Sequence, residues 1–129
     1  MGDRGPVILL IEDEPLVRAA VAEMLEDLGF VVAVAGSARE ASALLAGPDH
    51  PYHAIIIDLG LPDRPGDDLA KDILAGLADV PVIIASGGDP SELDPTLAGN
   101  ARVAFLSKPY GARGMIELLA GLGVAAAPP

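Results

Sequence analysis

Three acidic residues follow apolar runs in positions that suit metal binding. Glu12 and Asp13 come directly after the run 7–11, and Asp58 closes the run 54–57. Carboxylates that lie close together repel one another and raise one another's pKa unless a cation neutralises them. Oxygen ligands without His or Cys favour a hard cation, and Mg²⁺, which accepts carboxylates together with waters and phosphate oxygens, fits best. The acids therefore predict a Mg²⁺ site, provided that the fold brings them together.

A hydroxyl and an ammonium group follow two further apolar runs. Ser86 comes directly after the run 82–85, and Lys108 lies two residues beyond the run 103–106. Phosphoryl transfer uses such groups to bind the equatorial oxygens and to balance their developing charge. Taken singly, Ser86 is typical of a turn, Lys108 of a solvated surface and Asp13 of a helix cap. The coincidence at four strand ends is poorly explained by separate structural roles, so the set favours phosphoryl-transfer chemistry.

Five short apolar runs supply the strands that must position these residues. The runs are rich in β-branched residues and apolar on both faces, which is typical of parallel strands buried beneath helices on two sides. They cover residues 7–11, 30–34, 54–57, 82–85 and 103–106.

Segments of helical period separate the strands. Pro15 suits the first position of a helix that Gly29 ends, and Ser37 with Glu40 forms a capping box that opens a second helix, stopped at 47–48. Two more helices are predicted over 67–77 and 111–122. The predicted apolar stripes include Leu16, Ala20, Val21, Met24, Leu25 and Leu28 in the first helix, Ala41, Leu44 and Leu45 in the second, and Met115, Ile116, Leu118, Leu119 and Leu122 in the last.

The segment 87–100 differs from the other helical segments because it contains two prolines and three glycines. Such a composition allows only a short helix, which we expect within 91–97, and a face rich in loops.

The alternation of strand and helix predicts an α/β fold with a doubly wound, five-stranded parallel sheet. With so few strands the flavodoxin-like order 2-1-3-4-5 is expected, with a short or irregular fourth helix. Ligands bind such sheets at the carboxyl ends of the strands, where the strand order reverses. That point lies between the first and third strands, which carry Glu12, Asp13 and Asp58.

Length and composition limit the classes of protein. A chain of 129 residues fits one domain, which we expect over 6–123, with a disordered tail at 1–5 and a C-terminal tail at 124–129. The formal charge of −11 has the wrong sign for binding nucleic acid. The absence of cysteine excludes disulfides and thiolate sites. No apolar run is long enough for a membrane helix or a signal core, so we expect a cytoplasmic protein without a membrane partner.

Four motifs, in order along the chain, resemble those of the receiver domains of two-component response regulators. They are IED at 11–13, IIIDLGLP at 55–62, IIASG at 83–87 and FLSKPY at 105–110. The resemblance covers roughly 6–123, and no motif would suffice alone. It implies a stand-alone regulator in which Asp58 accepts a phosphoryl group from a histidine kinase or a histidine phosphotransfer protein. The same resemblance implies self-phosphorylation from small phosphodonors and self-dephosphorylation.

The resemblance also implies a role for each matching residue. Asp13 and Asp58 would bind Mg²⁺ directly, Glu12 would bind it through water, and the backbone carbonyl of Gly60 would add a ligand. The remaining roles are contacts to the phosphoryl oxygens from Lys108 and Ser86, a conformational switch made by Ser86 and Phe105, and a cis bond between Lys108 and Pro109. For Phe105 a plain role in the core stays open.

The downstream partner implied by the resemblance is a protein that binds the face formed by the fourth and fifth strands and helices. Three positions depart from the common pattern: Glu12 replaces an Asp, and Gly60 and Gly88 offer no side chain that could control access of water to the phosphoryl group. His50 and His53, in a proline-rich loop, are expected to be plain surface residues.

Two alternatives stay open, and a third is disfavoured. The chain could be a pseudo-receiver, an interaction module that is never phosphorylated, or a receiver cut from a hybrid histidine kinase. An aspartyl-nucleophile phosphohydrolase is disfavoured, because such enzymes place a second Asp two residues after the nucleophile, where this chain has Gly60.

Overall fold

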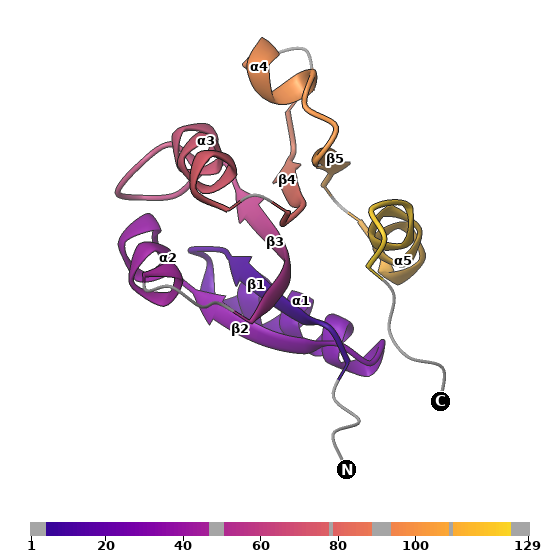
Figure 1. The fold of residues 1–129 in the computed structure, drawn as a ribbon. Helices are drawn as coiled ribbons and strands as arrows, with labels where there is room; N and C mark the ends of the chain where they lie inside the picture. Colours follow the sequence, from indigo (N-terminus) through magenta and orange to yellow (C-terminus); the bar gives the residue numbers. More distant parts are fainter. Residues whose placement is uncertain (1–4, 47–50, 78, 89–93, 109, 125–129) are drawn as a thin grey trace.

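Strands and helices alternate along the whole described chain (Figure 1). The computed structural model describes residues 5–46, 51–77, 79–88, 94–108 and 110–124. The strands are β1 (Val7–Ile11), β2 (Val31–Ala35), β3 (Tyr52–Asp58), β4 (Val82–Ser86) and β5 (Val103–Ser107). The helices are α1 (Pro15–Asp27), α2 (Ala38–Leu45), α3 (Gly66–Gly76), α4 (Pro95–Ala98) and α5 (Ala112–Gly121).

The strands form one parallel sheet in the order β2-β1-β3-β4-β5, which confirms the predicted fold and strand order. β1 lies between β2 and β3, and Ile11 at its end pairs with Ala35 on one side and with Ile57 on the other. The carboxyl ends of β1 and β3 therefore lie next to each other at one edge of the sheet, and the residues that follow them meet there.

Each central strand is buried on both faces, because alternate side chains enter two separate cores. In β1, Leu9 and Ile11 pack beneath α2, α3 and α4, whereas Ile8 and Leu10 pack beneath α1 and α5. β3 and β4 alternate in the same way. Figure 1 shows these two layers of helices on opposite sides of the sheet. Two-sided burial explains why runs such as Ala54–Ile57 in β3 and Val82–Ala85 in β4 are apolar at every position instead of alternating with polar residues.

Most helices begin at or within one residue of the predicted position, but the predicted apolar stripes include residues that the structure leaves exposed. Pro15 opens α1, and the Ser37 hydroxyl caps α2 by accepting the Glu40 N–H at 3.1 Å. The predicted burial of four residues is wrong: Leu16 is 85% exposed, Leu44 42% and Ile116 44%, and Ala20 is exposed as well. Leu16 lies in the first turn of its helix, where helical spacing is met but no neighbouring element covers the side chain.

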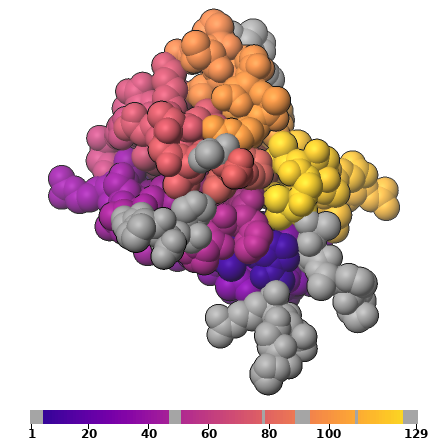
Figure 2. Space-filling model, viewed as in Figure 1, coloured from indigo at the N-terminus to yellow at the C-terminus, as the bar shows by residue number. Residues whose placement is uncertain are grey.

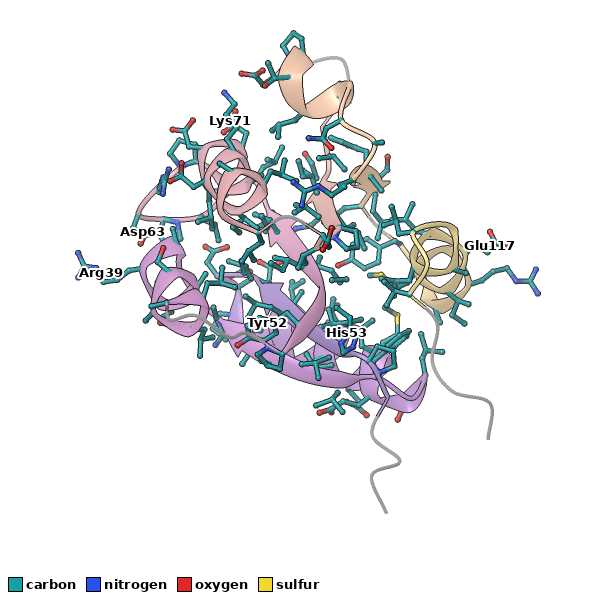
Figure 3. The ribbon with its side chains drawn as sticks, in the orientation of Figure 1. Arg39, Tyr52, His53, Asp63, Lys71 and Glu117 are labelled. Carbon is teal, nitrogen blue, oxygen red and sulfur yellow. The ribbon has the colours of Figure 1, made fainter. Side chains whose placement is uncertain are left out.

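The predicted bounds of two strands need correction. β2 begins one residue late, because the Phe30 N–H bonds the Leu25 carbonyl in the turn that ends α1. β3 begins two residues early, and the β1–β3 register shifts between Val7 and Ile8. At this irregularity His53, labelled in Figure 3, lies on the exposed side of β3, and its Nδ1 accepts the Val7 N–H at 3.0 Å. It therefore completes the strand pairing instead of lying in a loop.

The short fourth helix is confirmed, since α4 has a single turn. Its cap Asp94 accepts the Thr96 N–H and binds Lys71 of α3 at 2.5 Å, which ties α4 to α3. Every residue of β5, the neighbouring edge strand, is at least partly exposed. In Figure 2 the orange segment around α4 and β5 forms one end of the molecule, beside the yellow α5.

Several sequence predictions fall outside the described residues. They concern His50, the helix stop at 47–48, the start of the predicted fourth helix at 91–93, the bond to Pro109, and most of both tails. Val124, the first residue of the expected C-terminal tail, is described: it is 7% exposed and packs beneath α1 and α5. In the described part of the chain, no helix is long and apolar enough to cross a membrane.

Candidate functional site

The sequence-predicted acids meet at the sheet edge where the strand order reverses. Glu12 and Asp13 follow β1, and Asp58 ends the adjacent β3. One carboxylate oxygen from each residue lies within 4.8 Å of the others. The Glu12 N–H donates to the Ala35 carbonyl of β2 at 3.0 Å, so β1 keeps its alignment up to the first acid. The topology thus places three carboxylates from two distant parts of the chain close together.

Lys108 joins the acids from the end of β5. Its Nζ lies 3.1 Å from Asp58 Oδ1 and 3.3 Å from Glu12 Oε1. The Lys108 backbone N–H donates to the Ser86 carbonyl at 2.9 Å, which aligns the residue after β5 with the end of β4. Three carboxylates and one ammonium leave the cluster with a formal charge of −2, which a divalent cation would neutralise.

Burial sets the electrostatics of the cluster. Glu12 is 3% exposed, and this burial, supported by the charge of Asp58, raises the pKa of its carboxyl in spite of the Glu14 N–H and the Lys108 ammonium. Burial by itself lowers the pKa of Lys108, but the hydrogen bond and charge of Asp58, together with Glu12, outweigh it and raise that pKa. Lys108 is therefore charged at neutral pH, whereas the negative charge on Glu12 is disfavoured without a cation.

The donor set fits Mg²⁺. Its three oxygen ligands come from carboxylates, and they lie close enough together to bind one ion. Glu12 Oε2 is held by the Glu14 N–H at 3.1 Å, so the carboxylate is oriented before any ion binds. A Cβ at Gly60 would lie 3.8 Å from Asp58 Oδ2, so Gly60, two residues after Asp58, borders the same pocket. The close set of oxygen ligands suits a small, hard cation.

Ser86 and Phe105 lie at the neighbouring strands without joining the cluster. The Ser86 hydroxyl accepts the Gly88 N–H at 3.0 Å, in the loop after β4. Phe105 pairs in register with Ile84 and packs, partly buried, against the core beneath α3 and α4. The structure thus places Ser86 beside the pocket and Phe105 one strand farther away.

The loop between β3 and α3 is fixed by close packing at its end. A Cβ at Gly66 would lie 2.5 Å from the Asp58 carbonyl oxygen and 2.7 Å from Leu59 Cα, so a side chain has no room there. The Gly66 N–H donates to the Leu59 carbonyl at 3.1 Å. Glycine at this position lets α3 begin directly against the end of the strand that carries Asp58.

The same loop holds α2 through Asp63, a contact that the sequence analysis missed. The Asp63 carboxylate accepts the N–H groups of Ala38 and Arg39, both at 2.9 Å, and these two bonds lower its pKa. Figure 3 shows Asp63 at the start of α2, beside Arg39. The capping box Ser37–Glu40 signalled the helix start, but nothing local pointed to a second cap from a loop 25 residues away.

Arg18 is a second residue that the sequence analysis missed. Its Nη1 donates to the Glu12 carbonyl at 3.0 Å, from the first turn of α1. A side chain six residues from its partner carries no recognisable motif, so only the fold shows the contact.

A cavity of about 420 Å³ lies next to Lys108. It is lined by Val17, Val21, Lys108 and Tyr110, and burial raises the pKa of the Tyr110 hydroxyl. A second cavity, of about 270 Å³, lies between α2 and α3 and is lined by none of the acids or Lys108. The cavity beside Lys108 therefore adjoins the cluster. Its lining residues Val17 and Val21 belong to α1, and on the same helix Leu16 and Val17 are exposed.

Residues 8–120 match the family model described as the response regulator receiver domain. The transcriptional regulatory protein KdpE of Mycobacterium tuberculosis is 33% identical over 119 residues, which cover 92% of this chain and 50% of that protein. PdtaR of the same species is 32% identical, with 87% of this chain and 54% of that protein covered. This chain thus spans about half the length of these relatives.

Solved structures share the fold. A CheY-like response regulator receiver domain from Methylobacillus flagellatus superposes with a TM-score of 0.79 at 25% identity, over 92% of this chain and 98% of that one. The chemotaxis response regulator CheY4 of Vibrio cholerae has the same TM-score at 21% identity, over 92% and 98% of the two chains.

Proposed function

Because the chain belongs to the response regulator receiver family, we propose that it is a phosphorylation switch of two-component signalling in which Asp58 accepts the phosphoryl group. The observation that carries the proposal is the geometry at Asp58. One of its oxygens lies 3.1 Å from Lys108 Nζ, and carboxylate oxygens of Glu12, Asp13 and Asp58 lie within 4.8 Å of one another. A carboxylate nucleophile beside a cation and a metal site is the arrangement that phosphoryl transfer requires.

In the proposed reaction, an Asp58 oxygen attacks the phosphorus of a phosphohistidine in a histidine kinase or phosphotransfer protein. A new P–O bond forms, the P–N bond breaks, and the histidine nitrogen keeps the electron pair. Lys108 contacts the transferred oxygens as negative charge builds on them. Asp13, Asp58 and the Gly60 carbonyl would bind Mg²⁺ directly and Glu12 would bind it through water, and the ion would supply positive charge that balances the acids and the phosphoryl oxygens.

The phosphodonor protein would approach over α1. Leu16 is 85% exposed and Val17 37% exposed, and Val17 also lines the cavity that reaches Lys108. Exposed apolar side chains beside a charged pocket are suited to docking a partner protein. A cytoplasmic location is part of this proposal.

The output would follow from movement of Ser86 and Phe105. The Ser86 hydroxyl, which binds the Gly88 N–H in the structure, turns to the phosphoryl group, and Phe105 moves inward in response. Phosphorylation then shifts the population of two arrangements of the face formed by β4, α4, β5 and α5, which a downstream protein binds. The partly exposed β5 beside a one-turn α4 supports this choice of face.

The test is phosphorylation by acetyl phosphate with Mg²⁺, followed by intact mass measurement. We expect one added phosphoryl group on the wild type and on the control Asp27→Asn, an exposed residue at the end of α1, but none on Asp58→Asn. Chelation of Mg²⁺ should abolish the adduct. No adduct on the wild type would favour an interaction module that is not phosphorylated, and rapid turnover of a generic phosphate ester would favour a phosphohydrolase.

A further inference from the structure

Arg18 reaches from α1 to the main chain that carries two of the acids. Its Nη1 donates to the Glu12 carbonyl at 3.0 Å. Glu12 is already held elsewhere: its N–H bonds Ala35, and its carboxylate oxygens bond Lys108 and the Glu14 N–H. The hydrogen bond from Arg18 therefore adds little to the Glu12 side chain, and its effect falls on the peptide group that follows.

That peptide group joins Glu12 to Asp13. The Glu12 carbonyl, the Asp13 N–H and the Asp13 Cα lie in one rigid plane, so a bond that fixes the carbonyl also restricts the position of the Cα from which the Asp13 side chain extends. No hydrogen bond to the Asp13 carboxylate is found within the described residues, whereas Glu12 and Asp58 are both bound by Lys108. Among the three acids, Asp13 thus depends most on its backbone for its position.

The guanidinium of Arg18 occupies space that Gly36 leaves open. A Cβ at Gly36, in the loop between β2 and α2, would lie 2.9 Å from Arg18 Nη1. Gly36 is not among the described glycines with positive φ, so its backbone tolerates a side chain. The Gly36 N–H donates to Glu40 Oε1 at 2.9 Å, a bond that an added methyl group does not remove. A methyl group at this position would therefore displace the Arg18 guanidinium without changing any charge.

We propose that Arg18 is a positioning residue for the Mg²⁺ site: by fixing the peptide between Glu12 and Asp13, it aims Asp13 at the ion. The inference rests on the proposed function, because it assumes that the acids bind Mg²⁺. Residues behind the ligands of a metal site typically change metal affinity about 10- to 100-fold when they are removed.

The sign of the effect separates positioning from simple electrostatics. Arg18 is a cation near a site that attracts cations, so removal of its charge alone would strengthen Mg²⁺ binding. Loss of the hydrogen bond that orients Asp13 would weaken it. The two roles of Arg18 therefore predict opposite changes in the same dissociation constant.

The experiment measures Mg²⁺ affinity by isothermal titration calorimetry, without any phosphodonor. We expect Arg18→Ala to bind Mg²⁺ about 10-fold more weakly than the wild type, and Arg18→Lys, which retains a donor, to recover part of the loss. Gly36→Ala should weaken binding in the same direction. In the double variant, which combines Arg18→Ala and Gly36→Ala, the added methyl group has no guanidinium to displace. The Mg²⁺ affinity of the double variant should therefore equal that of Arg18→Ala.

The control is Arg113→Ala, an exposed residue of α5 whose removal makes the same change in net charge. Its Mg²⁺ affinity should match the wild type. Urea unfolding without metal shows whether each variant is folded, and the Asp13 amide signal in nitrogen–proton NMR spectra should shift in Arg18→Ala and Gly36→Ala. If Arg18→Ala does not fold, Gly36→Ala and the NMR signal still test the proposal.

Unchanged or stronger Mg²⁺ binding by Arg18→Ala, or strictly additive effects in the double variant, would overturn the role of Arg18. That outcome, with a wild type that binds Mg²⁺ and accepts phosphate, leaves the proposed function intact. A wild type that binds no Mg²⁺ overturns both. A wild type that binds Mg²⁺ but is never phosphorylated contradicts the proposed function alone.

Discussion

Glu12 is the charged residue with the least exposed side chain in the site, and its carboxylate is held at both oxygens. Burial and the neighbouring Asp58 raise its pKa, so the folded protein holds a proton on Glu12 more tightly than the unfolded chain does. This contribution to stability is greatest below the ordinary pKa of a Glu and is lost as the pH rises through the higher value in the folded protein. The carboxylate form of Glu12 is therefore less favourable in the metal-free fold than in the unfolded chain, and a bound cation would offset this cost.

The change Glu12→Gln tests this opposition between stability and metal binding. Without metal at pH 7, we expect the variant to be more stable than the wild type, since it buries no charge. The difference should shrink as the pH falls below the ordinary pKa of a Glu, because Glu12 then becomes protonated in both states. Urea unfolding in chelator across this pH range measures it. Mg²⁺ affinity should fall at least about 10-fold. A variant that is less stable than the wild type at pH 7 would contradict the expectation.

At the scale of elements, Arg102 joins the turn before β5 to the end of α3. Its guanidinium donates to the carbonyls of Leu74 at 2.7 Å, Leu77 at 2.5 Å and Val80 at 3.3 Å. The last carbonyls of a helix lack partners within the helix, and a cation there also interacts favourably with the helix dipole. Arg102 thus links the helix after the proposed phosphoacceptor to the edge strand of the proposed output face.

Removal of this guanidinium should destabilise the fold. We expect Arg102→Ala to lower the free energy of unfolding by about 2–3 kcal/mol, because partly buried carbonyls lose charged donors. Arg102→Lys, with one compact donor group, should lose less. Arg113→Ala, on an exposed face of α5, serves as the matched control and should change stability by less than about 0.5 kcal/mol. Urea unfolding measures all three, and a loss for Arg102→Ala no larger than for the control would refute the link.

At the scale of the whole molecule, the acids behind the formal charge of −11 affect stability to different degrees. Many acids lie on exposed faces, where salt screens them, whereas Glu12, Asp13 and Asp58 are forced together by the sheet. A cation that binds only the folded arrangement of the three must stabilise the whole fold, because the unfolded chain separates them.

Mg²⁺ should therefore raise the thermal unfolding midpoint of the wild type. At a concentration 100 times the dissociation constant, the gain is about 2.7 kcal/mol, which corresponds to roughly 10 °C for a domain of this size. Differential scanning calorimetry at constant ionic strength measures the shift. Asp13→Ala should show a much smaller shift of the midpoint. NaCl at the same ionic strength should not reproduce the shift in the wild type. An equal shift in Asp13→Ala would indicate that Mg²⁺ acts by general screening.

The sequence by itself determined the sheet, its strand order and the acids at its edge. Runs that are apolar on both faces, such as 54–57, must be buried on both sides, and short alternating helices leave few topologies. Once β1 and β3 are neighbours, Glu12, Asp13 and Asp58 meet without further information. The motifs around them were recognisable because the chemistry of the site depends on residue type and order along the chain.

Only the tertiary structure decided which long-range contacts hold the loops. The bonds from Arg18 to Glu12, from Asp63 to α2 and from Arg102 to α3 join polar side chains to backbone groups of other segments. Backbone groups are the same in every residue, so such contacts leave no pattern in the sequence. The exposure of Leu16 was equally hidden, because helical spacing shows which residues share a face but not whether another element covers it.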